Sequence, residues 1–475
     1  MSARDLTPLD ATFLELEEAD PGAHMHIGSL MLFAAPPDGG APALAELRAH
    51  VDRRLDALPR YRMRLSRRAT GILSWPSWEP HPAFDVAAHV TRAALPAPGD
   101  EAELLAWAGD FFSHRLDRAR PLWEIVLLEG LEGGGWALAT KTHHALVDGV
   151  GSVGVAEALL DREPGAAWGP PPGVAAGDGA REDGHGGLRA LARLPFRAAR
   201  DAAAVALHPD HAADALRRAA AMAELLVRDE LLAAPATSLN VPIGEHRRLA
   251  AMTVPMSAIR EVRDRHGGTM NDVVLALVTA GLRRVLLSRG EVLPATPLRA
   301  MVPVNLRPAG DDLALGNRVS SLFVHLPVGD PDPLARLAAV RADAARLKAG
   351  RQAEGGLALI ELGGLAPPLL HAVLAQSVFS RRLFNVTVTN VPGPRTTLYA
   401  LGAPMRAVVP LVPLAADHAV GVAVCSYAGD VCLCVNADRD TVPDVAGIVA
   451  GMRGELELLR GAGPGTAPAG AAARS

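Results

Sequence analysis

The sequence of 475 residues lacks three features that would each define a class of protein. It has no excess of basic residues, because its net charge is -5 and its isoelectric point is near 6.4, so we expect no nucleic-acid partner. It has no run of about 18 uncharged apolar residues, which is the length that a membrane-spanning helix needs. Its N-terminus, MSARDLTPLDATFLELEEAD, has no apolar segment before a cleavage site, so we expect a cytoplasmic protein and not a secreted one.

Cysteine is scarce, and the three cysteines of the chain fall within ten residues. Cys432 and Cys434 share one face of an expected strand, and Cys425 lies on the strand before it, across a YAGD turn. A CxC pair without a second pair of ligands nearby gives weak support for zinc. We therefore interpret the three thiols as small buried core groups and predict no metal site.

One stretch, LAPPLLHAVLAQSVF at residues 365–379, is apolar enough for two interpretations. A core helix after Pro367 and Pro368 is the preferred one. A segment that lies against a lipid surface is the other, and it keeps peripheral contact with a membrane or a lipid droplet open.

Strand-like and helical patterns alternate in two parts of the chain, which predicts an α/β fold. The stretch from 164 to 187 is rich in Pro, Gly, Ala and charge and predicts a flexible linker. Connecting helices rich in Ala, Arg and Leu follow it. We therefore predict domains at 1–163 and 240–460, a linker with connecting helices at 164–239, and a disordered tail at 461–475.

The individual elements follow from the spacing of apolar residues. Strands are expected at 24–34, 136–147, 298–306, 317–328 and 384–391, and helices at 42–58, 100–116 and 269–290. Thr269 or Asn271 is expected to cap the last of these helices. Both parts of the chain mix expected strands and helices in a similar way, which hints at a duplicated fold.

The stretch KTHHALVDGVG, residues 141–151, places two adjacent histidines before an Asp-Gly pair. Because side chains alternate along a strand, Thr142 and His144 are expected on one face, and Lys141 and His143 on the other. The two histidines then cannot share one task, and their spacing does not match that of chelating pairs. One imidazole can enter a cleft while the other packs or steadies the turn.

A histidine at the end of a strand suits a general base, because its ordinary pKa of about 6.5 lets it take and return a proton near neutral pH. Asp148 lies in the turn with Gly149, and its carboxylate is expected to fix the loop through a basic residue or by capping the next helix. The chain has no GxSxG elbow, no GxxxxGK[ST] phosphate loop and no HExxH pair. A base without a protein nucleophile indicates that the substrate supplies the nucleophile, as in direct transfer to a bound hydroxyl or amine.

The HHxxxDG motif, HHALVDG at 143–149, belongs to the large group of CoA-dependent acyltransferases and condensation domains. Over almost its whole length the chain further resembles the bacterial wax ester synthase / acyl-CoA:diacylglycerol acyltransferase family. The matching blocks, in order, are LTPLDATFL, MHIGSL, RPLWE, HHALVDG, NDVVLALV, LGNRVS, NVTVTNVPGP and ADRDTVPD. So many blocks in the right order make the resemblance specific.

The resemblance implies two chloramphenicol-acetyltransferase-like domains, each a mixed sheet flanked by helices, with the active site at their interface. It implies that His144 is the general base, which takes the proton of the acceptor hydroxyl as that oxygen attacks the acyl thioester. His143 and Asp148 are then supports for His144 and its loop, and Gly149 permits the sharp turn. Acyl-CoA enters as a co-substrate, and no cofactor is implied.

Several of the other matching sequence blocks contain residues that are candidates for substrate binding. Trp123 in PLWE is expected to pack beneath the site, and Asn390 to line the cleft at the end of its strand. Asn271 and Asp272 match the Asn-Asp pair that the resemblance places near the site, and helix capping is an equal alternative for Asn271. Four further residues are expected to contact loops of the second domain or the phosphates of CoA: Asn305, Arg307, Asn317 and Arg318.

The function that these residues predict is an O-acyltransferase that moves a long-chain acyl group from acyl-CoA to diacylglycerol or a fatty alcohol. Two alternatives stay open: a CoA-dependent acyltransferase for a hydroxyl or amine of a specialised metabolite, and a non-catalytic lipid-binding paralogue. Because only 4% of the residues are aromatic, an acyl tunnel is expected to be lined by Leu, Val, Ala and Met. Such walls discriminate chain length weakly, at about 0.8 kcal/mol per methylene.

Overall fold

A computed structural model describes residues 6–35, 39–66, 75–147, 149–165, 233–305, 319–349 and 380–462. Several predicted features lie outside these ranges. They are most of the 164–239 segment, the apolar stretch 365–379, the tail from residue 463, and Asp148, Arg307, Asn317 and Arg318.

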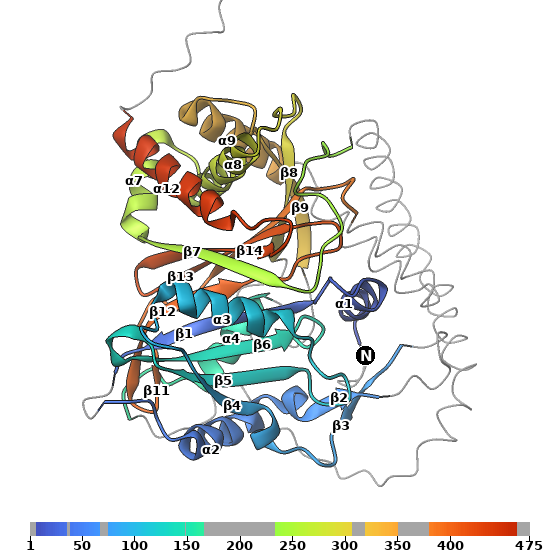
Figure 1. Ribbon diagram of the computed structural model, residues 1–475, viewed down its shortest axis with the longest axis vertical. Coiled ribbons are helices and arrows are strands. Elements are labelled where there is room, and N and C mark those ends of the chain that lie inside the picture. The colour runs from blue at the N-terminus through green and yellow to red at the C-terminus, as the bar shows by residue number, and fades with distance from the viewer. Residues whose placement is uncertain are drawn as a thin grey trace, which may run out of the picture.

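The first unit is built on a six-stranded sheet with the strand order β11-β12-β1-β6-β5-β4 (Figure 1). Its strands are β1 (His26–Phe33), β4 (Val90–Ala94), β5 (Trp123–Glu129), β6 (Trp136–His143), β11 (Tyr399–Ala400) and β12 (Ala403–Leu411). Strand β4 runs parallel to β5, and the other neighbours are antiparallel.

Helices α1 (Pro8–Ala19), α2 (Leu44–Arg54), α3 (Glu101–Ser113) and α4 (Gly149–Leu159) belong to this unit. So do the 3-10 helices η1 (Leu55–Ala57), η2 (Pro59–Arg62), η4 (Val86–Ala88) and η5 (Glu132–Gly134), and a small sheet of β2 (Met63–Leu65) and β3 (Trp78–Pro80).

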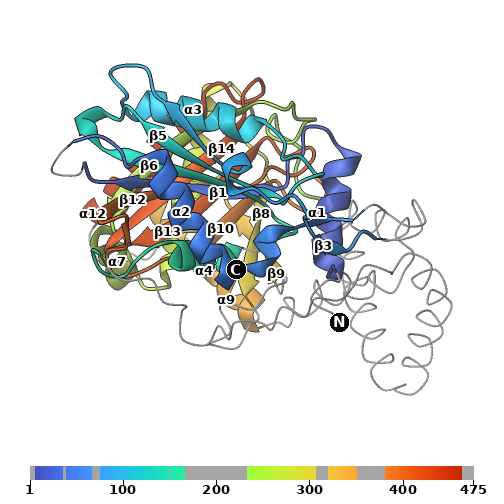
Figure 2. The ribbon, with the colours of Figure 1, turned by 90° about the horizontal axis from the view of Figure 1, so that it is seen from below.

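Helix α1 stands at the end of the first sheet, apart from α2 and α4, as the view from below shows (Figure 2). A capping box starts it, because the Thr7 hydroxyl accepts the Asp10 N–H and the Asp10 carboxylate accepts the Thr7 N–H, both at 3.0 Å. At this end of the sheet His26 of β1 lies opposite His143 of β6. The helix is therefore fixed beside the last residues of the histidine-bearing strand.

The second unit has a six-stranded sheet in the order β7-β14-β13-β10-β8-β9. Its strands are β7 (Arg247–Pro255), β8 (Leu298–Asn305), β9 (Val319–Leu326), β10 (Val386–Pro392), β13 (Val420–Tyr427) and β14 (Asp430–Asp438), and its helices are α7 (Met256–His266), α8 (Met270–Ser288), α9 (Pro333–Ala349) and α12 (Val445–Gly461). Strand β10 runs parallel to both β8 and β13, so this sheet is mixed. The helices gather on the side of this sheet that faces away from the first unit (Figure 1).

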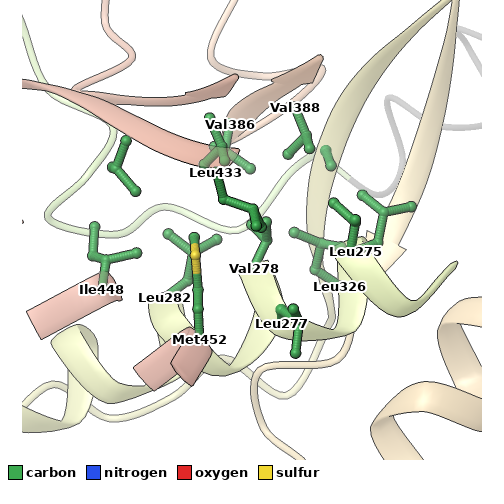
Figure 3. Packing of buried hydrophobic residues seen from close by; sticks show 14 of the residues in the cluster. Leu275, Leu277, Val278, Leu282, Leu326, Val386, Val388, Leu433, Ile448 and Met452 are labelled. Atoms are coloured by element: carbon green, nitrogen blue, oxygen red, sulfur yellow. The ribbon is translucent and has the colours of Figure 1, made fainter. Parts of the chain in front are cut away.

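Helix α8 lies at the centre of the second unit's core (Figure 3). Every residue from Asp272 to Leu282 is buried, and the cluster around the helix includes side chains of α12, β9, β10 and β14. Each large aliphatic side chain that is fully buried contributes about 1.5–3 kcal/mol. Gly281 lets α12 approach closely, because a Cβ there would lie 2.6 Å from the carbonyl oxygen of Ile448.

Strand β12 comes from the second half of the sequence but completes the first sheet, where it pairs with β1 (Figure 1). The register runs from Gly28 opposite Leu411 to Phe33 opposite Met405. The sequence predicted β1, β6, β8, β9, β10, β13 and β14, but it predicted neither β12 nor this exchange, because alternation within a strand does not identify its partner. The exchange ties the two units together beside the cleft described below.

The three cysteines occupy neighbouring strands, as predicted, with Cys425 of β13 opposite Cys432 of β14. All three are free and buried. Burial raises the pKa of the Cys425 thiol to about 12 and that of the Cys432 thiol to about 11, so neither ionises near neutral pH. Their interpretation as core residues is confirmed.

Candidate active site

Strand β6 separates the two histidines of the motif, as its alternation predicted. Thr140, Thr142 and His144 line a cleft on one side of the strand. Lys141 and His143 are buried on the other side, where the Lys141 ammonium donates to two backbone carbonyl oxygens at 3.0 and 2.9 Å. The expected difference between the environments of the two imidazoles is therefore confirmed.

His144 lies just after β6 and reaches the cleft with its side chain. Its backbone N–H donates to the carbonyl oxygen of Met25 at 2.8 Å. Its ring stacks on Phe13 of α1, with the ring centroids 4.0 Å apart. The side chain is half-buried, so the imidazole is held in place and is still reachable from the cleft. These are the conditions that a general base requires.

His143 is fully buried and holds the turn that follows it. Its Nδ1 accepts the backbone N–H of Ala145 at 3.0 Å, and its carbonyl oxygen accepts the N–H of Leu146 at 2.9 Å. Because Nδ1 accepts a hydrogen bond, the ring proton belongs on Nε2. That nitrogen lies 3.3 Å from Oε2 of Glu17.

Glu17 on α1 is a buried carboxylate that sequence reasoning missed. Its Oε2 accepts from Arg118 Nη2 at 2.7 Å, and its Oε1 lies 3.2 Å from Nε2 of His26. Burial alone would raise the pKa of Glu17, but the imidazoles of His143 and His26 beside it hold that pKa far below its usual range. Burial also lowers the pKa of His26, to about 3, so its ring is neutral near pH 7, and its Nε2 accepts the N–H of Leu116 at 3.5 Å. The motif therefore rests on an ionised side chain from the N-terminal helix.

The cleft beside His144 has an empty volume of about 1170 Å³, including space open to solvent. It is lined by β1, β5, β6 and α4 of the first unit and by β10, β12 and β13 from the second half of the chain. Most of its side chains are apolar, among them Ile27, Met31, Ile125, Leu159, Val408 and Val424. Hydroxyl groups come from Ser29, Thr140, Thr142 and Thr389. A large apolar cleft with a few polar groups is typical of a site for a lipid-like ligand.

Trp123 at the start of β5 is 1% exposed and forms part of the cleft wall. Its Nε1 donates to the carbonyl oxygen of Tyr61 at 2.7 Å, and its ring stacks on His89 at 4.6 Å between centroids. Thr142 of β6 lies opposite it in the sheet. The tryptophan is buried in the cleft wall, and its role there, whether packing beneath the site or contact with a substrate, stays a prediction.

Asn271, Asp272 and Asn390 lie together, but none of them lines the cleft. Asn390 Nδ2 donates to Asn271 Oδ1 at 3.3 Å. Asp272 forms a capping box with Thr269, whose N–H donates to the Asp272 carboxylate at 2.7 Å. Thr269, and not Asn271, therefore caps α8. On β10 it is Thr389, the neighbour of Asn390, that faces the cleft.

We expect Thr269→Ala to lower the free energy of unfolding by about 1 kcal/mol, because the first turn of α8 loses its cap. The kcat of the folded protein should stay within about twofold, since Thr269 is not among the residues that line the cleft. Urea unfolding and steady-state kinetics measure the two quantities. Ser257→Ala, at an exposed helical position, is the control and should change stability by less than about 0.5 kcal/mol. A large loss of kcat without a loss of stability would place the cap in the chemistry instead.

The remaining site residues are only partly described. Gly149 begins α4, and Asn305 ends β8. Asp148 and Arg318 lie outside the described residues, as do Arg307 and Asn317, so their expected roles stay predictions.

Two family models match the chain. The wax ester synthase/diacylglycerol acyltransferase catalytic domain matches residues 6–274, and the WS/DGAT C-terminal domain matches residues 315–460. The chain belongs to this family. The match to the catalytic domain of the WS/DGAT family contains α1, the histidine motif and Asn271.

Individual relatives support this family assignment. The chain is 34% identical over 456 residues to the probable diacylglycerol O-acyltransferase tgs1 of Mycobacterium tuberculosis, which is 96% of this chain and 95% of that protein. The solved wax ester synthase/diacylglycerol acyltransferase from Marinobacter aquaeolei VT8 matches with a TM-score of 0.68 and 29% identity, over 96% of this chain and all of that one. The first condensation domain of the calcium-dependent antibiotic synthetase shares the fold, with a TM-score of 0.61, 17% identity and 96% coverage of each chain.

These similarities confirm the family, the two-domain α/β fold and the acyltransferase activity that the sequence predicted. Within the described ranges, no three His, Cys, Asp or Glu side chains are grouped so that they could hold a metal ion. None of the helices in those ranges combines the length and the apolar character needed to cross a membrane.

Proposed function

We propose that the protein moves a long-chain acyl group from acyl-CoA to diacylglycerol or a long-chain alcohol, with His144 as the general base. The acceptor hydroxyl gives its proton to the His144 imidazole while its oxygen attacks the thioester carbonyl. The tetrahedral intermediate then collapses, the carbon–sulfur bond breaks, and the CoA sulfur takes the proton from His144. The products are the new ester and free CoA, and the imidazole returns to its neutral state.

One observation carries this proposal: the half-buried ring of His144 opens into a large, mostly apolar cleft between the two units. Aliphatic walls stabilise an alkyl chain by about 0.8 kcal/mol for each buried methylene. Such a cleft suits a long acyl chain or a long-chain acceptor better than a small polar substrate. The names of the relatives, diacylglycerol O-acyltransferase and wax ester synthase, favour the two acceptor classes.

The test is release of CoA thiol from palmitoyl-CoA with dioleoylglycerol, with hexadecanol, or with no acceptor. We expect release that depends on the acceptor, together with formation of triacylglycerol or wax ester. The acceptor with the higher kcat/KM identifies the acceptor class. Binding of palmitoyl-CoA without release of CoA would instead support a non-catalytic lipid-binding protein. Release only with a small hydroxylated or amine acceptor would support an enzyme of specialised metabolism.

Contact with a membrane or lipid-droplet surface is a further part of the proposal, because both acceptors partition into lipid. The apolar stretch that suggested this contact, 365–379, lies outside the described residues. The same assay can present dioleoylglycerol in phosphatidylcholine vesicles, followed by flotation of the vesicles. Protein that acts on the lipid but never floats with the vesicles would contradict lasting surface contact.

A further inference from the structure

Helix α1 holds both histidines of the motif with one face. Phe13 and Glu17 are four residues apart, so their side chains lie one turn apart on the same side of the helix. Phe13 stacks on the ring of His144, and Glu17 pairs with the ring of His143. The position of α1 therefore sets the position of both imidazoles.

Glu17 occupies a place where helix stability alone does not favour a carboxylate. It lies in the last turn of α1, near the negative end of the helix dipole, and its side chain is 2% exposed. A buried charge is costly unless ionic and hydrogen-bonding partners compensate for it. Arg118 is such a partner, with its Nη2 at 2.7 Å and its Nε at 3.2 Å from Oε2. The positive charge of Arg118 offsets part of the cost of burying the carboxylate, and an ionised carboxylate is a strong acceptor for the neighbouring His143 imidazole.

The contacts of Glu17 lead directly to the turn that presents His144. The carboxylate faces Nε2 of His143, and Nδ1 of the same ring accepts the N–H of Ala145. This arrangement requires the proton of the His143 ring to be on Nε2, and the negative charge of Glu17 favours that tautomer. If the proton moved to Nδ1, the hydrogen bond from Ala145 would be lost, and the residue after His144 would lose its anchor.

We propose that Glu17 is a positioning residue for the histidine motif. Its carboxylate fixes the tautomer and the orientation of His143, and His143 in turn holds the turn that places the His144 ring in the cleft. This inference rests on the proposed function, because it takes His144 as the base. It assigns catalytic importance to a residue of α1 that does not itself line the cleft.

The first variant is Glu17→Gln, which keeps the shape of the side chain and removes its charge. We expect kcat to fall on the order of 10–100-fold, because a misplacement of about 1 Å at a reacting group can cost about a hundredfold. The KM for palmitoyl-CoA should change less than about twofold, since Glu17 does not line the cleft. An unchanged kcat would overturn the proposal.

The matched control is Glu18→Gln, one residue further along the same helix. Glu18 also pairs with Arg118, at 2.9 Å from Nη1, but its side chain is 47% exposed. Its kcat should stay within about twofold of the wild-type value. If Glu17→Gln does not fold, Glu17→Asp provides the test, because it keeps the charge but draws the carboxylate back from His143. A normal kcat for Glu17→Asp would show that only the ion pair with Arg118 matters, against the proposal.

A double-mutant cycle separates positioning from general stabilisation. In a His143→Ala background, Glu17→Gln should lower kcat by less than about twofold, because the residue through which it acts is already gone. Losses that multiply would show that Glu17 acts independently of His143, and the proposal would be wrong.

Hydrogen exchange gives a measurement that does not depend on activity. The amides of Ala145 and Leu146 donate to His143, so they should exchange faster in Glu17→Gln than in Glu18→Gln or the wild type. Unchanged exchange would overturn the proposed chain of contacts. If the wild type transfers no acyl group to any acceptor, the proposed function fails, and the exchange rates still decide whether Glu17 holds the turn.

Discussion

His144→Ala is expected to lower kcat for acyl transfer by about a thousandfold, which is within the range that general base catalysis contributes. The reason lies in how the two imidazoles are placed. Only the ring of His144 lines the cleft, while the ring of His143 is committed to Ala145 on one side and Glu17 on the other. His143 therefore cannot replace the missing base without breaking the turn.

The loss should be in chemistry and not in folding. The hydrogen bond that anchors residue 144 to Met25 uses the backbone N–H, which alanine retains. Removing the ring exposes one face of Phe13, and we expect this to cost no more than about 1–2 kcal/mol of stability. Thermal unfolding and binding of palmitoyl-CoA should therefore be close to those of the wild type.

A second histidine variant controls for the loss of an imidazole as such. His246 is exposed and does not line the cleft, so His246→Ala should keep kcat within about twofold. Thiol release under saturating palmitoyl-CoA measures kcat for all three proteins. If His144→Ala retains more than about a tenth of the wild-type kcat, His144 is not the base, and the transfer needs another proton acceptor.

The strand pattern around the motif was enough to predict that the two histidines lie on opposite sides of the strand. Alternation is a property of the backbone, so it assigned Thr142 and His144 to one face and Lys141 and His143 to the other before any partner was known. The same rule located β10 and its end at the Pro-Gly-Pro sequence. It did not prevent the wrong choice of Asn390 for the cleft wall, where Thr389 lies instead, because both faces of that strand carry polar residues.

Contacts between segments that are far apart in the chain could not be predicted from the sequence. Glu17 is one acidic residue among several in ELEEAD, and nothing local distinguishes it from Glu15 or Glu18. Its role depends on Arg118 and His143, which are about a hundred residues away in the chain. The pairing of β12 with β1 depends likewise on tertiary packing. Short-range patterns predict elements and faces, but partners across the fold require the assembled structure.

We also expect the protein to lose much of its stability in acid, because of two buried histidines near the motif, His24 and His26. Burial, followed by the charge of Arg247, lowers the pKa of His24 to about 4, and burial lowers that of His26 to about 3. Their pKa in the unfolded chain is about 6.5. Between these values the unfolded state binds a proton at each site that the folded state does not, so stability is full above pH 6.5 and falls as the pH drops. At pH 5 the loss is about 2 kcal/mol for each histidine.

Other buried histidines act in the same direction, whereas Glu455, whose pKa burial raises, acts in the opposite one. Burial lowers the pKa of His50, His89 and His418, so these histidines also favour unfolding in acid. The pKa of Glu17 is lowered as well, so its contribution is present above the ordinary glutamate pKa of about 4.5 and is lost only at lower pH. The first acid-induced loss therefore comes from the histidines and not from the carboxylate.

A combined loss of about 4 kcal/mol from His24 and His26 is a large share of the 5–15 kcal/mol that typically stabilises a domain. For a domain of 150–250 residues it lowers Tm by roughly 8–16 °C, measured by calorimetry at pH 7.5 and pH 5.0. His24→Gln removes one titrating group, so its Tm should differ less between the two pH values, whatever its stability at pH 7.5. The exposed His246→Gln is the matched control and should show the full wild-type difference. Equal wild-type Tm values at both pH values would mean that His24 and His26 are protonated as readily in the folded protein as in the unfolded chain, and that α1 and β1 do not seal them from water.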